Sequence, residues 1–237
     1  MILITRPEEE AIKLKKILKK QGLQCHIDSL SKIENVLTKV KFDVDGIAML
    51  TSLRATKIFV KKYNKSKNTP LIIIGLNSYK KAVDSGFSNI IFFGEHSNEV
   101  YKFLKKNVKK NKPQKIIYFT STVINEHFIL KIKELGYQVN SRVVYKTNFK
   151  QRLKPLTVQL IKKNKLKVCL IYSQQNANHF CKLINSHGLY DYSKKIIFVT
   201  ISKMVSQILK KNGYKRVRTA AKPNQKSVVK KLMLELL

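Results

Sequence analysis

The chain has 237 residues, enough for one large domain or two small ones, and its hydrophobic content of 43% suffices to bury a core in either case. The 48 basic residues against 14 acidic ones give a net charge of +34, which attracts nucleic acid, anionic membrane or a polyanionic small molecule. No segment approaches 18 consecutive apolar residues, and the acidic start MILITRPEEE is unlike a signal peptide, so we expect a globular cytoplasmic protein.

Short apolar runs, of the kind typical of buried strands, alternate with lysine-rich stretches of helical period along the whole chain. In chain order the runs are Ile2–Thr5, Gly46–Leu50, Leu71–Ile74, Ile90–Phe93, Lys115–Thr120, Lys167–Tyr172 and Lys195–Ile201. Four helix-like stretches end in a glycine followed by an apolar residue, as helix C-terminal caps do: Gly22, Gly86, Gly136 and Gly213. This alternation predicts an α/β fold with parallel sheets and right-handed crossovers.

Three of the apolar runs end in similar ten-residue stretches. These are LTSLRATKIF from Leu50, FTSTVINEHF from Phe119 and IYSQQNANHF from Ile171. In each, a serine ends the run, and a phenylalanine follows seven residues later, two helical turns along one face. We therefore expect these three phenylalanines to be core residues: Phe59, Phe128 and Phe180.

The hydroxyls in these stretches are candidate ligand contacts. Parallel sheets bind ligands beyond the carboxyl ends of their strands, where helix N-termini offer free N–H groups and a partial positive charge. Five hydroxyl residues are predicted at such ends: Thr51, Ser52, Thr120, Ser121 and Ser173. Any one of them caps a helix more often than it binds an anion, but together they could form an anion-binding rim.

Other features narrow the chemistry. Only six of the basic residues are arginines, and the lysines are spread along nearly every predicted helix, which favours solvated lysine faces as much as a function for the charge. The cysteines Cys25, Cys169 and Cys181 match no metal or redox spacing, so we expect buried or half-buried thiols. The sequence has no glycine-rich phosphate loop, GxSxG elbow or histidine pair at metal spacing, and we expect neither metal nor organic cofactor.

Six further stretches carry a resemblance over nearly the whole chain. They are ILITRPEEEA, DGIAMLTSLRA, PLIIIGLNSYKKAVDSGF, KELGYQVNSRVVYKT, LIYSQQNANHF and ISKMVSQILKKNGYKRVRTAAKPNQKSVVKKL. In order and spacing they resemble the uroporphyrinogen-III synthase family. The resemblance rests on the order and spacing of all six motifs over the whole chain.

The resemblance implies a particular architecture. It consists of two flavodoxin-like parallel-sheet domains joined by a two-stranded antiparallel linker, with the substrate in the cleft between the domains. The terminal domain would combine residues 1–30 and 148–237, and the middle domain would be residues 31–147. We place the linker strands near Ile27–Ile33 and Ser141–Phe149. The family often has a proline where this chain has Asp28, which bears on the shape of the first linker.

The resemblance also implies an activity, a lyase reaction. Enzymes of this family cyclise the linear tetrapyrrole hydroxymethylbilane with inversion of ring D, through an azafulvene and a spiro intermediate. The substrate has eight carboxylates, which suits a rim of hydroxyls, helix N-termini and lysines. The substrate-binding residues carried over from the family are Thr51, Ser52, Arg54 and Ser78 in the middle domain and Ser173 and Ser202 in the terminal one. Near Ser202, many relatives have a hydroxyl residue where this chain has Met204.

Tyr145, in VVYKT, matches a recurrent tyrosine of the family, and the resemblance implies that its phenol assists departure of the substrate's hydroxyl. A tyrosine that merely packs in its strand is the alternative. We expect a monomer that acts on a small molecule and does not associate with a membrane. Two other functions stay open: a non-catalytic two-domain protein that binds anions or tetrapyrroles, and, less favoured, a basic nucleic-acid-binding protein.

Overall fold

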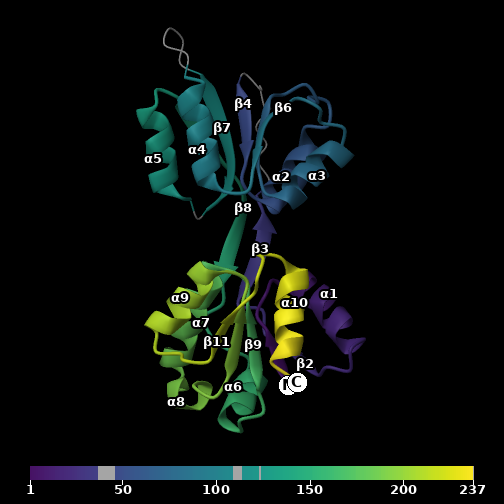
Figure 1. Ribbon diagram of the computed structural model, residues 1–237, viewed down its shortest axis with the longest axis vertical. Helices are drawn as coiled ribbons and strands as arrows, with labels where there is room; N and C mark the ends of the chain where they lie inside the picture. Colours follow the sequence, from purple (N-terminus) through teal and green to yellow (C-terminus); the bar gives the residue numbers. More distant parts are fainter. Residues whose placement is uncertain (37–45, 109–113, 123, 237) are drawn as a thin grey trace. The chain divides into compact units, whose positions relative to one another are not determined.

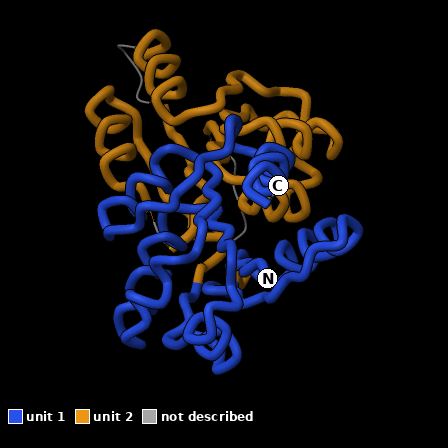
Figure 2. Tube along the Cα trace, turned by 60° about the horizontal axis from the view of Figure 1, so that its bottom comes forward, with its two compact units in different colours: residues 1–32, 148–237 blue, residues 33–147 orange. Residues whose placement is uncertain are grey.

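The structure is a computed structural model that describes residues 1–36, 46–108, 114–122 and 124–236. The chain forms two compact units, which are coloured separately in Figure 2. Unit 1 contains Met1–Lys32 and Asn148–Leu237, and unit 2 contains Ile33–Thr147. Unit 2 is therefore an insertion in the sequence of unit 1.

Unit 1 is built on a five-stranded sheet in which neighbouring strands are parallel. Across the sheet the strands are β11 (Val217–Thr219), β10 (Ile197–Thr200), β9 (Val168–Ile171), β1 (Ile2–Ile4) and β2 (Cys25–Ile27). Helices cover both faces of the sheet (Figure 1). One face packs against α6 (Pro155–Lys162), α7 (Gln174–Ser186), α8 (Tyr190–Ser193) and α9 (Lys203–Lys211), and the other against α1 (Glu8–Lys19) and α10 (Gln225–Leu234).

Unit 2 has a larger sheet. Its strand order is β3 (Ser31–Asn35), β8 (Gln138–Phe149), β7 (Lys115–Ser121), β4 (Ile47–Leu50), β5 (Leu71–Ile74) and β6 (Ile90–Gly94). The pairs from β8 to β6 are parallel. One face packs against α2 (Leu53–Lys62) and α3 (Leu76–Asp84), and the other against α4 (Ser97–Lys106) and α5 (Glu126–Glu134). By sequence, β3 and β8 run from one unit into the other.

The predicted class, α/β with parallel sheets, is confirmed, and all seven predicted strands are present with ends shifted by at most two residues. Each of them is an apolar run, because a strand covered on both faces buries consecutive side chains. The prediction missed β2 and β11, which have only three residues each. It also treated Ser141–Phe149 as a linker alone, whereas β8 begins at Gln138 and pairs with β7 as far as Tyr145.

The predicted helix caps are confirmed. All four glycines have the left-handed φ that an L side chain rarely adopts: 75° at Gly22, 83° at Gly86, 93° at Gly136 and 85° at Gly213. At the end of α1, for example, Gly22 N–H donates to the carbonyl of Lys19 and Leu23 N–H donates to that of Leu18. The three phenylalanines of the repeated stretches lie in the core, since Phe59, Phe128 and Phe180 are 0%, 7% and 0% exposed.

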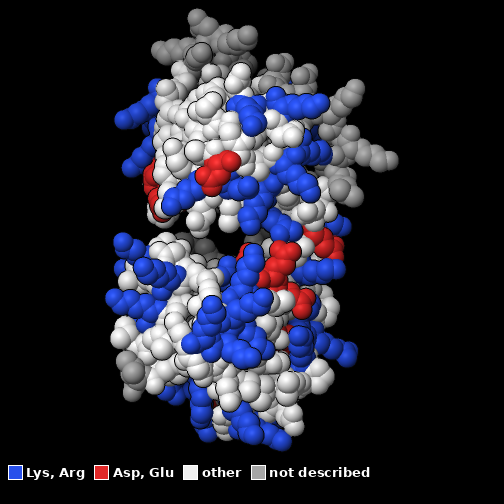
Figure 3. All heavy atoms as spheres, turned by 90° about the vertical axis from the view of Figure 1, so that its right-hand side faces the viewer, with Lys and Arg blue, Asp and Glu red and all other residues white. Residues whose placement is uncertain are grey.

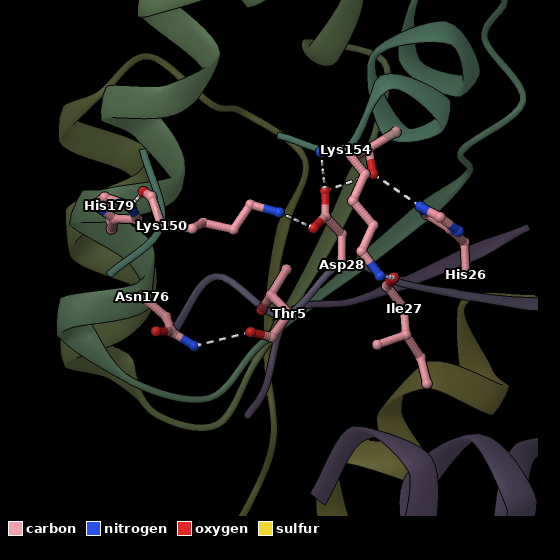
Figure 4. Close-up of polar contacts among 9 residues, drawn as sticks. Thr5, His26, Ile27, Asp28, Lys150, Lys154, Asn176 and His179 are labelled. Carbon is pink, nitrogen blue, oxygen red and sulfur yellow. Dashed lines mark hydrogen bonds and ion pairs between the residues drawn. The ribbon is translucent and has the colours of Figure 1, made fainter. Parts of the chain in front are cut away.

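A buried carboxylate holds α6 to the end of β2 (Figure 4). Asp28 is 0% exposed and forms an ion pair with Lys150. Its Oδ2 accepts hydrogen bonds from Lys154 N at 2.9 Å and Thr157 Oγ1 at 2.6 Å. Lys154 is the N-cap of α6 and its side chain makes no capping hydrogen bond, so Asp28, just after β2, instead satisfies the Lys154 N–H at the start of the helix.

His26 completes this group, which we call the Asp28 cluster (His26, Asp28, Lys150, Lys154 and Thr157). His26 Nε2 lies 2.8 Å from Thr157 Oγ1. The Thr157 hydroxyl already donates to Asp28, so it accepts from His26, and the imidazole proton is therefore on Nε2. Burial lowers the pKa of His26, and the nearby carboxylate of Asp28 opposes this shift.

Candidate active site

In unit 2, the carboxyl end of β4 carries two adjacent hydroxyls. β4 ends at Leu50, and the chain continues through Thr51 and Ser52 into α2. Ser52 is the N-cap of α2, and its Oγ accepts a hydrogen bond from Ala55 N at 3.2 Å. This bond satisfies one of the free N–H groups of the first helical turn, as the sequence predicted for a serine at this position.

Two tyrosines, one from each of the next two strands, reach these hydroxyls. Tyr118 on β7 has its phenol oxygen 3.1 Å from Thr51 Oγ1. Tyr145 on β8 has its phenol oxygen 3.3 Å from Ser52 Oγ. The two rings pack on opposite faces of the sheet, Tyr118 with α4 and α5 and Tyr145 with α2 and α3. The end of β4 is thus bordered by a phenol on each face.

An irregularity in β8 accompanies the position of Tyr145. The parallel register between β7 and β8 shifts between Thr120 and Ser121, so that Ser121 lies opposite Tyr145 and Val144 is passed over. Such a bulge redirects the side chain that follows it. Val144 is 3% exposed, and the ring of Tyr145 is half-buried against the same core cluster.

Arg54 and Ser78 lie on first turns of unit 2 helices. Arg54 is partly buried at the start of α2, and its Nη2 donates to Asn35 Oδ1 at 3.0 Å. Ser78 is 3% exposed on the first turn of α3, whose N-cap is Gly75. Gly75 has φ of 91°, and Ser78 N–H donates to its carbonyl. Ser78 is therefore not the N-cap of α3.

In unit 1, Ser173 and Ser202 are also N-caps. Ser173 Oγ accepts from Asn176 N at 3.1 Å at the start of α7, and Ser202 Oγ accepts from Val205 N at 3.4 Å at the start of α9. They follow the neighbouring strands β9 and β10, so both lie at the carboxyl edge of the unit 1 sheet. Met204, beside Ser202, is 58% exposed.

The second of the repeated stretches, FTSTVINEHF, does not follow the predicted pattern. β7 continues through Thr120 and Ser121, which are 4% and 8% exposed. The next helix, α5, begins only at Glu126, and its N-cap is Asn125, which accepts from Phe128 N at 3.1 Å. Ser121 therefore ends its strand as predicted, but the expectation that it starts a helix as Ser52 and Ser173 do is wrong.

Charged groups at the same edge of unit 1 are engaged with one another. Arg6 follows β1, donates from Nε to Glu10 at 2.9 Å and from Nη1 to Gln225 at 2.8 Å, and its guanidinium lies 4.2 Å from the ring centre of Tyr172. Burial raises the pKa of Tyr172 to about 12, with Arg6 opposing the shift. Arg6 thus joins the start of α1 to the start of α10.

Tyr118, which contacts Thr51, is a residue of the candidate site that the sequence did not predict. It lies inside the apolar run KIIYFTS and is 5% exposed, so the pattern predicts only a core residue. The available signal is chemical: a buried phenol needs a hydrogen-bond partner, and a strand next to a hydroxyl-bearing strand end can supply one.

The lysines are distributed widely. Figure 3 shows lysine and arginine side chains over much of the visible surface of both units, and few acidic ones. The cysteines are as predicted, with Cys25 half-buried and Cys169 and Cys181 buried. In the described parts of the chain, no group of three or more His, Cys, Asp or Glu side chains could hold a metal ion. No helix there is long and apolar enough to cross a membrane.

Parallel sheets whose carboxyl edges carry hydroxyls, phenols and helix N-termini define an α/β protein suited to binding an anionic ligand. Residues 12–230 match the family described as uroporphyrinogen-III synthase HemD. The chain belongs to the uroporphyrinogen-III synthase family, whose members are cyclising lyases of heme biosynthesis.

Solved structures agree with this assignment at the level of the fold. The uroporphyrinogen-III synthetase of Helicobacter pylori is 15% identical, with a TM-score of 0.65 over 100% of this chain and 99% of that one. A mutant uroporphyrinogen-III synthase of Thermus thermophilus is 10% identical, with a TM-score of 0.66 over 100% of this chain and 98% of that one. A search of curated proteins gave no significant match.

Proposed function

We propose that the chain closes hydroxymethylbilane to uroporphyrinogen III, with Tyr145 assisting the departure of the substrate's hydroxyl. The observation that carries this role is the position of the Tyr145 phenol, 3.3 Å from the hydroxyl that caps α2 at the carboxyl edge of the unit 2 sheet. A phenol there can donate to an oxygen of a ligand at the positive end of α2.

The proposed chemistry needs one proton donor and firm positioning. The terminal hydroxyl takes a proton from the phenol and leaves as water, which converts the end of the bilane into an electrophilic azafulvene. Ring D attacks through its substituted carbon to give the spiro intermediate, which fragments and closes again with ring D inverted. The proton lost at the final closure returns to the phenolate, so the net reaction releases one water.

Positioning supplies a large share of the catalysis, because the free substrate closes spontaneously to the uninverted type I isomer. The groups that we propose for binding its carboxylates are the hydroxyls and the guanidinium already described: Thr51, Ser52, Arg54, Ser78, Ser173 and Ser202. Support comes from their location on first turns or strand ends, where free N–H groups and the helix dipole favour anions. Lysines on both units add to the attraction.

We further propose that the two units are flavodoxin-like domains of a monomer, joined by antiparallel linker strands. In favour of the first part, unit 1 has the order β2-β1-β9-β10-β11, which is 2-1-3-4-5 when strands are counted along unit 1. Two hydrogen bonds favour the second. Lys150 N donates to Leu30 O and Val36 N to Val144 O, so the residue number rises along β3 as it falls along β8.

The direct test is to incubate the pure protein with freshly made hydroxymethylbilane and to measure the ratio of type III to type I product. We expect type III product to dominate. A purely type I outcome with folded protein would remove the proposed activity. Binding of tetrapyrroles without any change in the closure would instead favour a non-catalytic binding protein.

Nucleic-acid binding is the second candidate, since the net charge of +34 favours it. The arginines, however, offer little for base or phosphate recognition. Besides Arg54, which we assign to the substrate, three of the other five donate to groups of their own chain: Arg6, Arg216 and Arg218. Submicromolar binding to DNA or RNA that weakens steeply with salt would support this candidate.

A further inference from the structure

The hydroxyl of Ser52 has more hydrogen-bonding capacity than helix capping uses. A serine hydroxyl has one proton to donate and two lone pairs that accept. As the N-cap of α2, Ser52 accepts from Ala55 N and so uses one lone pair only. Its proton remains available, and Tyr145 Oη lies 3.3 Å away. Within the described residues, this phenol oxygen has no other hydrogen-bond partner.

We propose that Ser52 is a positioning residue for the reaction, in place of the carboxylate contact assigned to it above, and that its hydroxyl donates to the phenol oxygen of Tyr145. This inference rests on the proposed function, in which the phenol gives its proton to the departing hydroxyl. If Ser52 donates, the phenol accepts on its oxygen and keeps its own proton for the substrate. If Tyr145 donated to Ser52 instead, that proton would be directed into the protein.

The direction of the bonds follows from where they start. The Ala55 N–H belongs to the first turn of α2, the positive end of the helix dipole. Accepting from this N–H makes the Ser52 O–H a stronger donor, and accepting from Ser52 does the same for the phenol, because hydrogen bonds in a chain polarise one another. In this order, Ala55 donates to Ser52, Ser52 donates to Tyr145, and Tyr145 donates to the substrate. Each bond strengthens the next donor, so the phenol becomes a better donor to the substrate's departing hydroxyl oxygen, which gains negative charge as it leaves.

The other N-cap serines show that capping does not require this contact. Ser173 and Ser202 accept from the third residue on, as Ser52 does, and no tyrosine hydroxyl lies within hydrogen-bond distance of either in the described parts of the chain. Among these three N-cap serines, the contact with a phenol is particular to Ser52. Because of this contact, we expect the loss of either the Ser52 hydroxyl or the Tyr145 hydroxyl to slow the same step, the departure of the substrate's hydroxyl.

The test uses Ser52→Gly, because glycine is itself a good N-cap and so preserves the start of α2. We expect Ser52→Gly to lower kcat about three- to twentyfold, the effect of one lost hydrogen bond, with KM changed less than about twofold. Ser52→Thr keeps the hydroxyl and should restore most of kcat. Asn125→Gly is the matched control: it removes the side-chain cap of α5 in the same unit, and kcat should stay within about twofold of the wild type.

A double-mutant cycle decides between the two roles of Ser52. If Ser52 acts through Tyr145, adding Ser52→Gly to Tyr145→Phe lowers kcat no further. The inference is overturned if Ser52→Gly lowers kcat by the same factor in both backgrounds, or if it only raises KM, as a direct carboxylate contact would. Failure of the proposed function looks different: Tyr145→Phe alone would then keep full kcat.

Discussion

The sheets of the two units share one arrangement of five strands, which the chain enters at different points, and β3 adds a sixth strand in unit 2. Read across the sheet, β2-β1-β9-β10-β11 in unit 1 corresponds to β8-β7-β4-β5-β6 in unit 2. In each unit the first of these strands follows the second along the chain, and the remaining three are consecutive. In unit 2, however, the first two strands come last, as in a circular permutation. Sequence order therefore hides the correspondence.

This correspondence explains the three repeated stretches. Ser52 follows β4 and Ser173 follows β9, which are equivalent central strands, and each serine caps the next helix. Thr120 and Ser121 end β7, which corresponds to β1. The residues after β1, Thr5 and Arg6, do not cap a helix either, since α1 begins after Pro7 without a side-chain cap. Two of the three stretches are equivalent, and the third is similar in sequence alone.

The corresponding outer strands β2 and β8 differ in how far their polar groups are buried and hydrogen-bonded. β2 leads to Asp28, which is fully buried and has three partners in its own unit. The corresponding strand β8 carries Tyr145, which is half-buried and has one partner. Fully satisfied polar groups stabilise, whereas a donor with capacity left can act on a ligand. We therefore expect changes in the Asp28 cluster to affect stability and changes at Tyr145 to affect turnover.

The largest effect should come from Tyr145→Phe. We expect kcat to fall roughly ten- to a thousandfold, within the range that general acids supply or a little below it. The product should remain type III, and Tm should shift little because the ring still packs. Steady-state kinetics, product analysis and thermal unfolding check the three statements.

A second tyrosine of unit 2 provides the control. Tyr137 is 5% exposed and donates to the carbonyl of Leu104 at 3.0 Å, so Tyr137→Phe should lower Tm and leave kcat unchanged. Full kcat in Tyr145→Phe, or activity lost only through unfolding, would make Tyr145 structural and would erase the contrast between the units.

Much of the fold could be predicted, because parallel strands that are buried on both faces have runs of consecutive apolar residues in the sequence. β4 and β9 bury all four of their residues, and both were predicted to within one residue at each end. β2 is half-buried throughout and only three residues long, so it has neither an apolar run nor a clear alternation. β8 buries only Val139 and Val144 of its 12 residues, so it lacks the apolar run that would distinguish a sheet strand from a linker.

The site could be predicted only in part. Serines at strand ends are recognisable, and Ser52, Ser173 and Ser202 are N-caps. Ser121 was misassigned because sequence similarity does not reveal which strand of the sheet it follows. Tyr118 was missed because its contact with Thr51 joins strands 67 positions apart in the chain. The role of Tyr145 came from the family resemblance, since a tyrosine in an apolar strand usually packs.

The next effect is on stability and tests the unit 1 side of the contrast. Lys150→Met removes the ion-pair partner of the buried Asp28 carboxylate, so we expect the free energy of unfolding to fall by about 2 kcal/mol, below the usual cost because Asp28 keeps two hydrogen bonds. Urea denaturation measures this change. The control is Lys194→Met, which breaks an exposed pair with Asp191 and should change stability very little. Equal stability of both variants would show that the buried pair is not a stabilising anchor.

A smaller effect is expected from Ser78→Ala at the unit 2 rim. If Ser78 binds a substrate carboxylate in the ground state and the transition state alike, KM should rise about three- to tenfold while kcat changes less. Initial rates over a range of bilane concentrations separate the two constants. Ser78 is not the N-cap of α3, so no cap is lost in this variant. Unchanged kinetics together with a lowered Tm would make Ser78 a packing residue of the first turn.

The smallest effect concerns pH and the Asp28 cluster. Burial lowers the pKa of His26 in the folded state; Asp28 raises it, and Lys154, Lys15 and Lys150 lower it. The unfolded chain therefore takes up a proton near pH 6.5 that the folded chain takes up only at lower pH. The contribution of His26 to stability is therefore fully present above pH 6.5. It is lost as the pH falls from 6.5 toward the pKa of His26 in the folded state.

His26→Gln removes this titration but keeps an N–H that can donate to Thr157. We expect the difference in Tm between pH 7 and pH 5.5 to be smaller in this variant than in the wild type, by a degree or two at most because the imidazole is only partly buried, as thermal unfolding at both pH values will measure. An unaltered difference in His26→Gln would mean that another group of unit 1 sets its response to acid.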